Sequence, residues 1–161
     1  MSARDGHDSQ GTIRVLACDD STVVHRLLAR VFRDVPDIEL VGTATNGRLA
    51  LSRIDVLAPD AILLDVEMPV MDGLETVRAL RARGATQPII MFSTLTVRGG
   101  EATFEALSRG ADDYVPKPEG HGSLAAAIDA TREILVPKLR ALVGRRRLAA
   151  RARARPRPAG E

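Results

Sequence analysis

Short apolar segments alternate with amphipathic segments along most of the chain. Five of the short segments predict strands, at 12–18, 39–44, 61–64, 88–92 and 114–115. Each is followed by apolar residues at helical spacing, within 24–32, 49–54, 74–80, 104–107 and 124–135. Such alternation is typical of a parallel sheet with helices on both faces and right-handed connections. We therefore predict an α/β domain with a five-stranded parallel sheet.

Single residues mark several boundaries of these elements. Ser21 is a good N-cap residue before the first amphipathic segment, and Gly110 is a C-cap candidate after the fourth. Asp72 and Gly73 predict a turn. Pro137 suits the first position of a helix, so a helix is expected to restart there.

The two ends of the chain differ in composition from its middle. Residues 1–11 are polar and predict a disordered leader, while residues 12–136 carry the alternation and form the predicted domain. Residues 137–161 predict a helical extension that passes, from Gly144, into an Arg-rich flexible tail or linker. The net charge of +2 hides an asymmetry: 138–161 holds nine basic residues and one acid, while 1–137 holds 14 basic residues and 20 acids. An acidic domain therefore carries a basic tail.

Composition excludes several classes of protein. Aromatic residues make up only 2% of the chain, which argues against a stacking platform for single-stranded nucleic acid. The single cysteine, Cys18, excludes a disulfide framework and a cysteine-based zinc site, and its position predicts a buried thiol. No apolar run approaches the roughly 20 residues that cross a bilayer. We expect a cytoplasmic protein with no membrane contact.

Chemically suggestive residues follow the predicted strands. Asp19 and Asp20 follow the first, Asp65 follows the third, Ser93 ends the fourth and Lys117 follows the fifth. Each alone is more typical of a loop or a cap, but parallel strands end at one edge of a sheet, where open α/β sheets bind ligands. Crowded carboxylates need a cation, and all-oxygen ligation suits Mg²⁺. A metal-bound aspartate beside an ammonium and a hydroxyl predicts a phosphoryl acceptor.

Four motifs carry a resemblance to a known family: RVLACDDS (14–21), LLDVEMPVMDG (63–73), IIMFST (89–94) and GADDYVPKP (110–118). With these motifs, residues from about Thr12 to Val136 resemble the receiver domain of two-component response regulators. The variants DVEMPVMDG, MFSTLT and YVPKP are similar to the receiver half of the chemotaxis protein-glutamate methylesterase (CheB type). The resemblance implies a flavodoxin-like (βα)5 fold and a role in chemotaxis signalling.

The resemblance also implies a phosphorylation site and a metal site. Asp65 would accept a phosphoryl group from a histidine kinase, with a kinase of the chemotaxis type expected. Asp20 would bind Mg²⁺ directly and Asp19 through water, and Asp65 with the backbone carbonyl of Glu67 would complete the site. The charge of Glu67 would also face the water that later hydrolyses the acyl phosphate.

Other residues correspond to the family's switch. Ser93 would sense the phosphoryl group through its hydroxyl, and Lys117 would form an ion pair with it. Thr94 begins the loop 94–100 that would rearrange, and Tyr114 would turn inward when Ser93 moves. The Lys117–Pro118 bond would be a cis peptide, a rare geometry that is normally confined to X–Pro bonds such as this one.

Several alternatives stay open. No G-x-S-x-G elbow is present and neither His7, His25 nor His121 is placed to complete a serine triad, so the methylesterase chemistry is not expected in this chain. The chain is a stand-alone receiver, a diverged paralogue or the N-terminal part of a longer methylesterase. A phosphatase with an aspartate nucleophile would need a second aspartate where Glu67 stands. The basic tail predicts at most weak, non-specific contact with nucleic acid, or a contact that shields the acidic pocket. The downstream partner is not identified.

Overall fold

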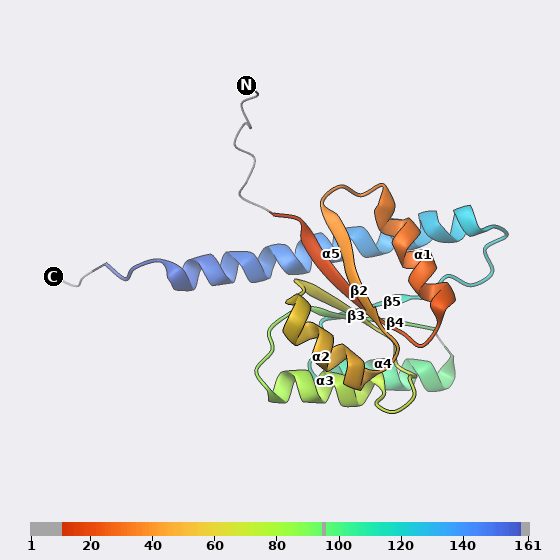
Figure 1. Ribbon diagram of the computed structural model, residues 1–161, viewed down its shortest axis with the longest axis horizontal. Helices are drawn as coiled ribbons and strands as arrows, with labels where there is room; N and C mark the ends of the chain where they lie inside the picture. Colours follow the sequence, from red (N-terminus) through yellow and green to blue (C-terminus); the bar gives the residue numbers. More distant parts are fainter. Residues whose placement is uncertain (1–10, 95, 159–161) are drawn as a thin grey trace, which may run out of the picture.

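The computed structural model of the protein describes residues 11–94 and 96–158. In this part of the chain, ten elements alternate: β1 (Ile13–Cys18), α1 (Thr22–Arg33), β2 (Ile38–Ala44), α2 (Gly47–Leu57), β3 (Ala61–Leu64), α3 (Gly73–Ala82), β4 (Ile89–Ser93), α4 (Val97–Arg109), β5 (Asp113–Pro116) and α5 (Leu124–Ala154). The strands form one parallel sheet in the order β2-β1-β3-β4-β5 (Figure 1). The predicted five-stranded parallel sheet is confirmed.

Two apolar cores lie on opposite faces of the sheet. Successive side chains of a strand point to opposite faces, so β1 sends Val15 and Ala17 to one core and Leu16 and Cys18 to the other. Helices α1 and α5 cover the first core, and α2, α3 and α4 cover the second (Figure 1). Because both faces are covered, the central strands β3 and β4 are buried along their whole length and do not alternate between apolar and polar residues. The sheet is therefore rigid support for the loops at its edges.

Polar side chains fix where helices begin. The Oγ of Ser21 accepts from the amide of Val24, so the predicted N-cap of α1 is confirmed. Asp72 and Gly73, expected as a turn, instead start α3: Asp72 is its N-cap and forms a capping box with Glu75. Gly110 ends α4 with φ of 122°, a conformation that favours glycine, as predicted for a C-cap.

The last helix is longer than the sequence predicts. Instead of restarting at Pro137 and losing structure from Gly144, α5 runs without a break to Ala154, so the expected flexible tail is helical over most of its length. Leu139 and Val143 are buried in the core beyond the proline, and their burial holds the helix against the sheet. Alanine and arginine, which dominate the rest, are strong helix formers.

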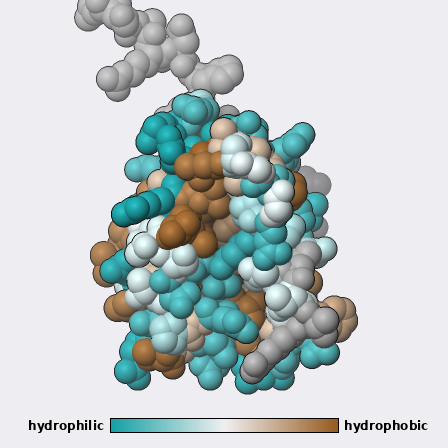
Figure 2. All heavy atoms as spheres, turned by 90° about the vertical axis from the view of Figure 1, so that its right-hand side faces the viewer, coloured by the Kyte–Doolittle hydropathy of each residue, from teal (hydrophilic) through white to brown (hydrophobic). Residues whose placement is uncertain are grey.

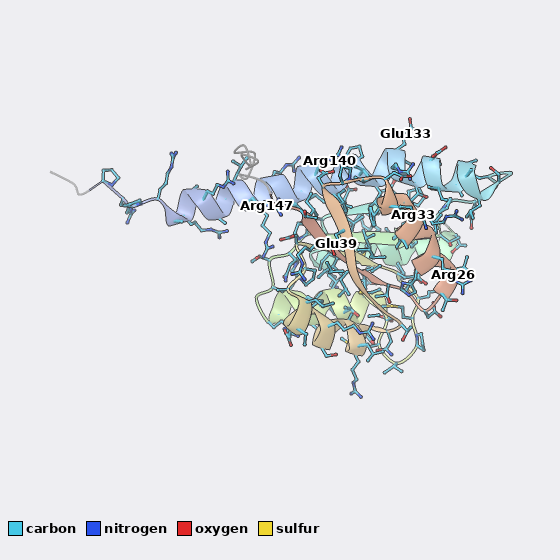
Figure 3. All side chains as sticks on the ribbon, turned by 45° about the horizontal axis from the view of Figure 1, so that its top comes forward. Arg26, Arg33, Glu39, Glu133, Arg140 and Arg147 are labelled. Carbon is cyan, nitrogen blue, oxygen red and sulfur yellow. The ribbon has the colours of Figure 1, made fainter. Side chains whose placement is uncertain are left out.

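Arginine side chains bind the extended part of α5 to the amino ends of the strands. Arg140 donates to both carboxylate oxygens of Asp37 at 2.9 and 2.8 Å, just before β2. Arg147 donates to the carbonyl of Gly11 at 2.8 Å, just before β1, and lies 3.5 Å from Asp60 (Figure 3). These contacts lie at the edge of the sheet opposite the carboxyl ends of the strands. Over the described residues, the basic segment therefore does not cover the acidic pocket.

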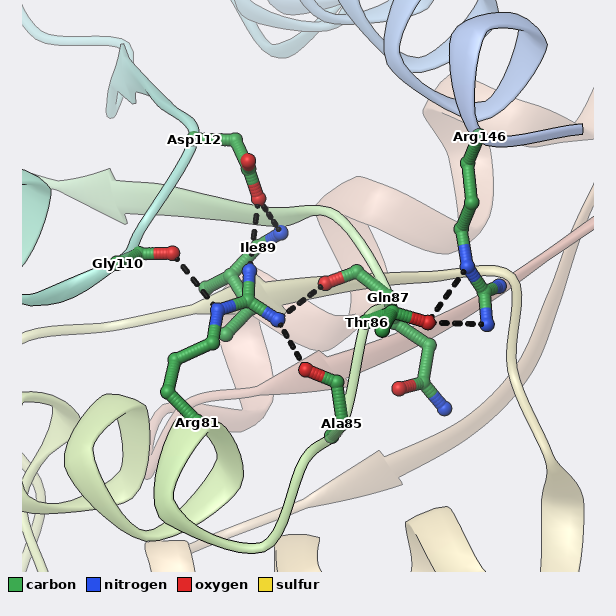
Figure 4. Close-up of polar contacts among 8 residues, drawn as sticks. All are labelled: Arg81, Ala85, Thr86, Gln87, Ile89, Gly110, Asp112 and Arg146. Carbon is green, nitrogen blue, oxygen red and sulfur yellow. Dashed lines mark hydrogen bonds and ion pairs between the residues drawn. The ribbon is translucent and has the colours of Figure 1, made fainter. Parts of the chain in front are cut away.

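Arg81 ties several loops together at the same edge (Figure 4). Its guanidinium pairs with Asp112 at 2.9 Å, and Asp112 in turn accepts from the amide of Ile89 at the start of β4. The same guanidinium donates to three backbone carbonyls within 2.9 Å, those of Ala85, Gln87 and Gly110. Arg146 of α5 adds hydrogen bonds to the Thr86 hydroxyl. The loops that precede β4 and β5 are thus held by charge-assisted bonds.

Within residues 11–94 and 96–158, none of the helices has both the length and the apolar character needed to cross a membrane.

Candidate functional site

The predicted site residues meet at the carboxyl edge of the sheet. Backbone hydrogen bonds continue the ladder one residue past the strands and fix the residues there: Asp65 donates its amide to the carbonyl of Cys18 at 2.9 Å, and Lys117 to that of Ser93 at 2.9 Å. A pocket of about 220 Å³ opens between these strand ends. Its lining includes six of the predicted residues, namely Asp20, Asp65, Glu67, Ser93, Thr94 and Lys117. The sequence prediction that these residues share one edge is confirmed.

Three carboxylates form the acidic part of the site. Asp19, Asp20 and Asp65 each offer one oxygen, and these oxygens lie within 4.8 Å of one another. Asp19 and Asp65 are buried, with 2% and 8% of their surface exposed, whereas Asp20 faces solvent. The amide of Ser21 donates to Oδ1 of Asp19 at 2.9 Å, which fixes that side chain. Its other oxygen, Oδ2, is buried and has the ammonium of Lys117 as its neighbour at 2.7 Å.

Lys117 is the cation that faces these carboxylates. Its Nζ lies 2.7 Å from Oδ2 of Asp19 and 3.2 Å from Oδ2 of Asp65. Burial of the ammonium acts to lower the pKa of Lys117, but the hydrogen bond and charge from Asp19, together with Asp65, outweigh it and raise the pKa above its ordinary value. One ammonium therefore bridges two buried carboxylates and stays charged.

Asp65 is the carboxylate whose protonation the site perturbs most clearly. Burial, and secondly the negative charge of Asp19, raise the pKa of Asp65 from 3.8 to about 6, although Lys117 and the amide of Val66 act in the opposite direction. The Val66 amide donates to Oδ1 at 2.8 Å. One lysine thus compensates only part of the charge of the cluster.

The donor set fits a hard divalent cation. Three carboxylates at one point, with one exposed to solvent, match the oxygen ligands and retained waters that Mg²⁺ prefers. Oδ2 of Asp19 already faces the Lys117 ammonium, but a carboxylate offers about four lone-pair positions, so the cluster keeps acceptor capacity for a cation. Glu67 is exposed beside the pocket that it helps to line, and the role of its carbonyl as a ligand stays a prediction.

Gly73 explains how the loop after β3 approaches Asp65. A Cβ at position 73 would lie 2.1 Å from the carbonyl oxygen of Asp65, so only glycine fits there. Gly73 also donates its amide to the carbonyl of Val66 at 2.8 Å. The first residue of α3 is therefore packed directly on the backbone of the central aspartate.

The expected cis peptide is wrong. The described residues contain no cis peptide bond, so the bond between Lys117 and Pro118 is trans. The trans form is the more stable isomer of an X–Pro bond by about 0.5–1 kcal/mol, and Lys117 reaches Asp19 and Asp65 from it.

The predicted switch residues occupy different environments. Ser93 is buried with 3% exposed, and Thr94 is half-buried at the start of the next loop. Tyr114 points outward with 40% of its surface exposed, and the Nζ of Lys138 lies 5.4 Å from the centre of its ring. The structure therefore shows one position of Tyr114, and its inward turn stays a prediction.

Sequence reasoning missed one buried partner of this group. Thr103 lies on α4 with 4% exposed, and its Oγ1 is 3.0 Å from the Oγ of Ser93. Its place three residues before the buried Ala106 put it on the inner face of the helix. Helical spacing could thus predict that Thr103 is buried, but nothing in the sequence indicates that it contacts Ser93.

An apolar groove lies beside the site, on the face shown in Figure 2. It runs between α1 and the start of α5, with Val23, Leu27 and Leu124 as its apolar lining and three arginines of α1 around it: Arg26, Arg30 and Arg33. Val23 is 71% and Leu124 54% exposed. Val23, at the site end of the groove, lies in the first turn of α1, which begins two residues after Asp20.

Comparison with known proteins agrees with the geometry. Residues 15–129 match the response regulator receiver domain family. A protein-glutamate methylesterase/protein-glutamine glutaminase of a Nocardioides species is 51% identical over 92% of this chain and 39% of its own length. The corresponding protein of Trichodesmium erythraeum is 44% identical over 83% of this chain and 38% of its own. The chain thus spans about two fifths of the length of these relatives.

Solved structures show the same likeness. The response regulator domain of Thermotoga maritima CheB superposes with a TM-score of 0.71 and 35% identity, over 83% of this chain and 97% of that one. The Vibrio cholerae chemotaxis protein CheY4 gives a TM-score of 0.63 and 30% identity, over 82% and 99%. The fold, the strand-end residues and these relatives lead to one conclusion: the chain belongs to the response regulator receiver domain family and is similar to the receiver half of CheB-type chemotaxis methylesterases.

Proposed function

We propose that Asp65 accepts a phosphoryl group from a phosphorylated histidine of a chemotaxis-type kinase, with Mg²⁺ bound beside it. The observation that carries the proposal is the cluster of three carboxylate oxygens within 4.8 Å, bridged on one side by Lys117. If Lys117 served only a structural ion pair, a single carboxylate would be enough to neutralise its ammonium. Three carboxylates around one ammonium leave negative charge uncompensated, which suits a divalent cation and a transferring phosphoryl group.

The bond changes are those of a phosphoryl transfer. A carboxylate oxygen of Asp65 forms a bond to phosphorus while the bond from phosphorus to the histidine nitrogen breaks and leaves its electron pair on the imidazole. Asp65 is ionised at neutral pH, since its pKa of about 6 lies below 7, so it attacks without losing a proton. The product is an acyl phosphate on Asp65.

Asp19, Asp20 and Asp65 would hold the metal ion, with the carbonyl of Glu67 completing the set. When bound, Mg²⁺ supplies positive charge that offsets the phosphoryl oxygens. Lys117 supplies a second positive charge, fixed 3.2 Å from Asp65 before any phosphoryl group arrives. A charge that is already in place does not have to be reorganised during the reaction.

Ser93 and Tyr114 would transmit the modification. Phosphorylation adds about −1.5 to −2 charge and strong acceptor oxygens at Asp65. The Ser93 hydroxyl lines the same pocket and would donate to one of these oxygens, which draws the loop that begins at Thr94 toward the site. Tyr114 would then leave its exposed position and change the surface of α4, β5 and α5. This surface would contact the downstream partner.

The groove between α1 and α5 suits the phosphodonor protein. Its apolar lining fits an apolar helix face, and the arginines around it, for which the described residues show no ion pair, favour a partner with acidic side chains. A partner in this groove would stand beside Asp20 at the mouth of the site.

The methylesterase activity in the names of the relatives belongs to those proteins, of which this chain spans about two fifths. A cytoplasmic location stays a prediction.

The proposal is tested with a small phosphodonor and intact-mass measurement. The protein is incubated with acetyl phosphate and Mg²⁺, and the expected result is a gain of one phosphoryl group that is absent with a chelator. Asp65→Asn should gain none. Asp55→Asn, which alters an exposed aspartate paired with Arg83 on α2, is the matched control and should label normally. Labelling of Asp65→Asn to the same extent as the control would reject the proposal.

A further inference from the structure

The hydroxyl of Ser93, which lines the pocket, is already engaged by a residue that does not line it. Its Oγ lies 3.0 Å from Oγ1 of Thr103, and both residues are almost fully buried. Thr103 belongs to α4, whereas Ser93 is the last residue of β4. A buried side-chain hydrogen bond thus connects the end of the strand to the helix that follows it.

The direction of this hydrogen bond follows from the hydrogens available. A threonine hydroxyl carries one proton, and the Oγ1 of Thr103 donates it to the carbonyl of Gly99 at 2.8 Å. Thr103 therefore accepts from Ser93, whose own single proton points to α4. While this bond lasts, Ser93 has no proton to donate to an oxygen in the pocket.

The same contacts hold the first turn of α4. Gly99 packs so closely on the loop that a Cβ there would lie 2.6 Å from the carbonyl oxygen of Thr94. The Oγ1 of Thr96 caps the helix by accepting from the Gly99 amide at 2.9 Å. The Ser93–Thr103 hydrogen bond is thus one of several contacts that hold the loop after β4 and the first turn of α4 in place.

We propose that Thr103 is a positioning residue that holds Ser93 in its resting orientation, so that the Ser93–Thr103 hydrogen bond must break when Ser93 turns to a phosphoryl group on Asp65. The inference rests on the proposed function and adds to it a restraint on the switch. Loss of the bond releases Ser93 and at the same time removes one tie between β4 and the first half of α4. Thr103 contacts no reacting atom and acts only through Ser93.

Removal of the restraint should favour the phosphoryl-bound state. A buried neutral hydrogen bond contributes a net free energy that corresponds to about 2- to 10-fold in an equilibrium constant. Thr103→Val keeps the shape of the side chain and removes the acceptor. In that variant, Ser93 loses its resting partner but keeps its partner in the pocket, so the affinity for a phosphoryl mimic should rise by this factor.

The test uses beryllium fluoride as the mimic, at fixed Mg²⁺, with the full chain and binding followed by calorimetry. We expect Thr103→Val to bind it about 2- to 10-fold more tightly than the parent protein. Thr103→Ser keeps the hydroxyl and should restore the parent affinity. In the Ser93→Ala background, Thr103→Val should change nothing, because the proton it would release is gone.

Two results would overturn the inference: an unchanged or weaker affinity in Thr103→Val, or an equal gain in the Ser93→Ala background. If Thr103→Val does not fold, Thr103→Ala takes its place, and the parent protein, the Thr103 variant, Ser93→Ala and the double variant are compared in the same way. A parent protein that binds no beryllium fluoride with Mg²⁺ would instead reject the proposed function, which separates the two failures.

Discussion

Neutralising Asp65 should stabilise the metal-free protein. Burial and Asp19 raise the pKa of Asp65 from 3.8 to about 6, which means that the folded state disfavours its charge despite Lys117. One pKa unit corresponds to about 1.4 kcal/mol, so the ionised side chain lowers the free energy of unfolding by about 2–3 kcal/mol at pH 7. Asn at position 65 removes this charge and keeps an oxygen to accept from the Val66 amide.

The pH dependence follows from the same shift. Because the folded pKa is raised, the folded state binds more protons than the unfolded state between about pH 4 and pH 6. The contribution of Asp65 to stability is therefore fully present below pH 4 and lost as pH rises through 6. Asp65→Asn has no carboxylate to ionise and does not lose stability in this way. Its free energy of unfolding should therefore exceed that of the parent protein only slightly near pH 4 and by about 2–3 kcal/mol at pH 7.

Urea unfolding with a chelator present measures both quantities. For a chain of this length, an increase of about 2–3 kcal/mol also corresponds to a rise in Tm of roughly 4–12 °C. Asp55→Asn, an exposed aspartate, should change stability little at either pH. Addition of Mg²⁺ should reverse the order, since an ion that binds the folded parent stabilises it by mass action. An advantage of Asp65→Asn that is absent at pH 7, or equal at pH 4 and pH 7, would refute the reasoning.

Three further substitutions test other parts of the structure. Arg81→Ala removes the hydrogen bonds that hold the loops before β4 and β5 and should cost about 2–4 kcal/mol in urea unfolding; a cost below about 0.5 kcal/mol would contradict the role of this arginine. Gly73→Ala should lower the free energy of unfolding by about 3 kcal/mol or more, because the added Cβ would overlap the Asp65 carbonyl. Its control is Gly100→Ala, where the added Cβ meets open space and the free energy of unfolding should stay the same or rise. Val23→Ser should lower kcat/KM for phosphotransfer from a phosphorylated histidine kinase about 3- to 10-fold, leaving acetyl phosphate labelling unchanged. Val56→Ser, at another exposed valine on α2, is its control, and an equal loss in both variants would exclude the groove as the docking site.

The part of the fold that periodicity fixes was predictable from the sequence. Buried parallel strands are short apolar runs, and their order of appearance with amphipathic segments determines the architecture. The strand order β2-β1-β3-β4-β5 does not follow from that pattern and is given by the structure. The meeting of Asp19, Asp65 and Lys117 was predictable because each follows a strand in a parallel sheet.

Features that depend on tertiary contacts were not predictable in the same way. The helix continues beyond Pro137 because Leu139 and Val143 are buried in the core and Arg140 pairs with Asp37. These contacts join residues that lie far apart in the sequence, so the pattern of neighbouring residues does not reveal them. The Ser93–Thr103 bond joins residues ten apart across a turn that the sequence does not specify.

The site of modification is the most direct measure of the central claim. The protein labelled with acetyl phosphate and Mg²⁺ is reduced with borohydride, which converts an acyl phosphate of aspartate to homoserine, and is then digested and sequenced by mass spectrometry. We predict homoserine at position 65 and at no other aspartate. Homoserine at position 19 or 20 instead, or none in a protein that has gained a phosphoryl group, would contradict the assignment of Asp65 as the acceptor.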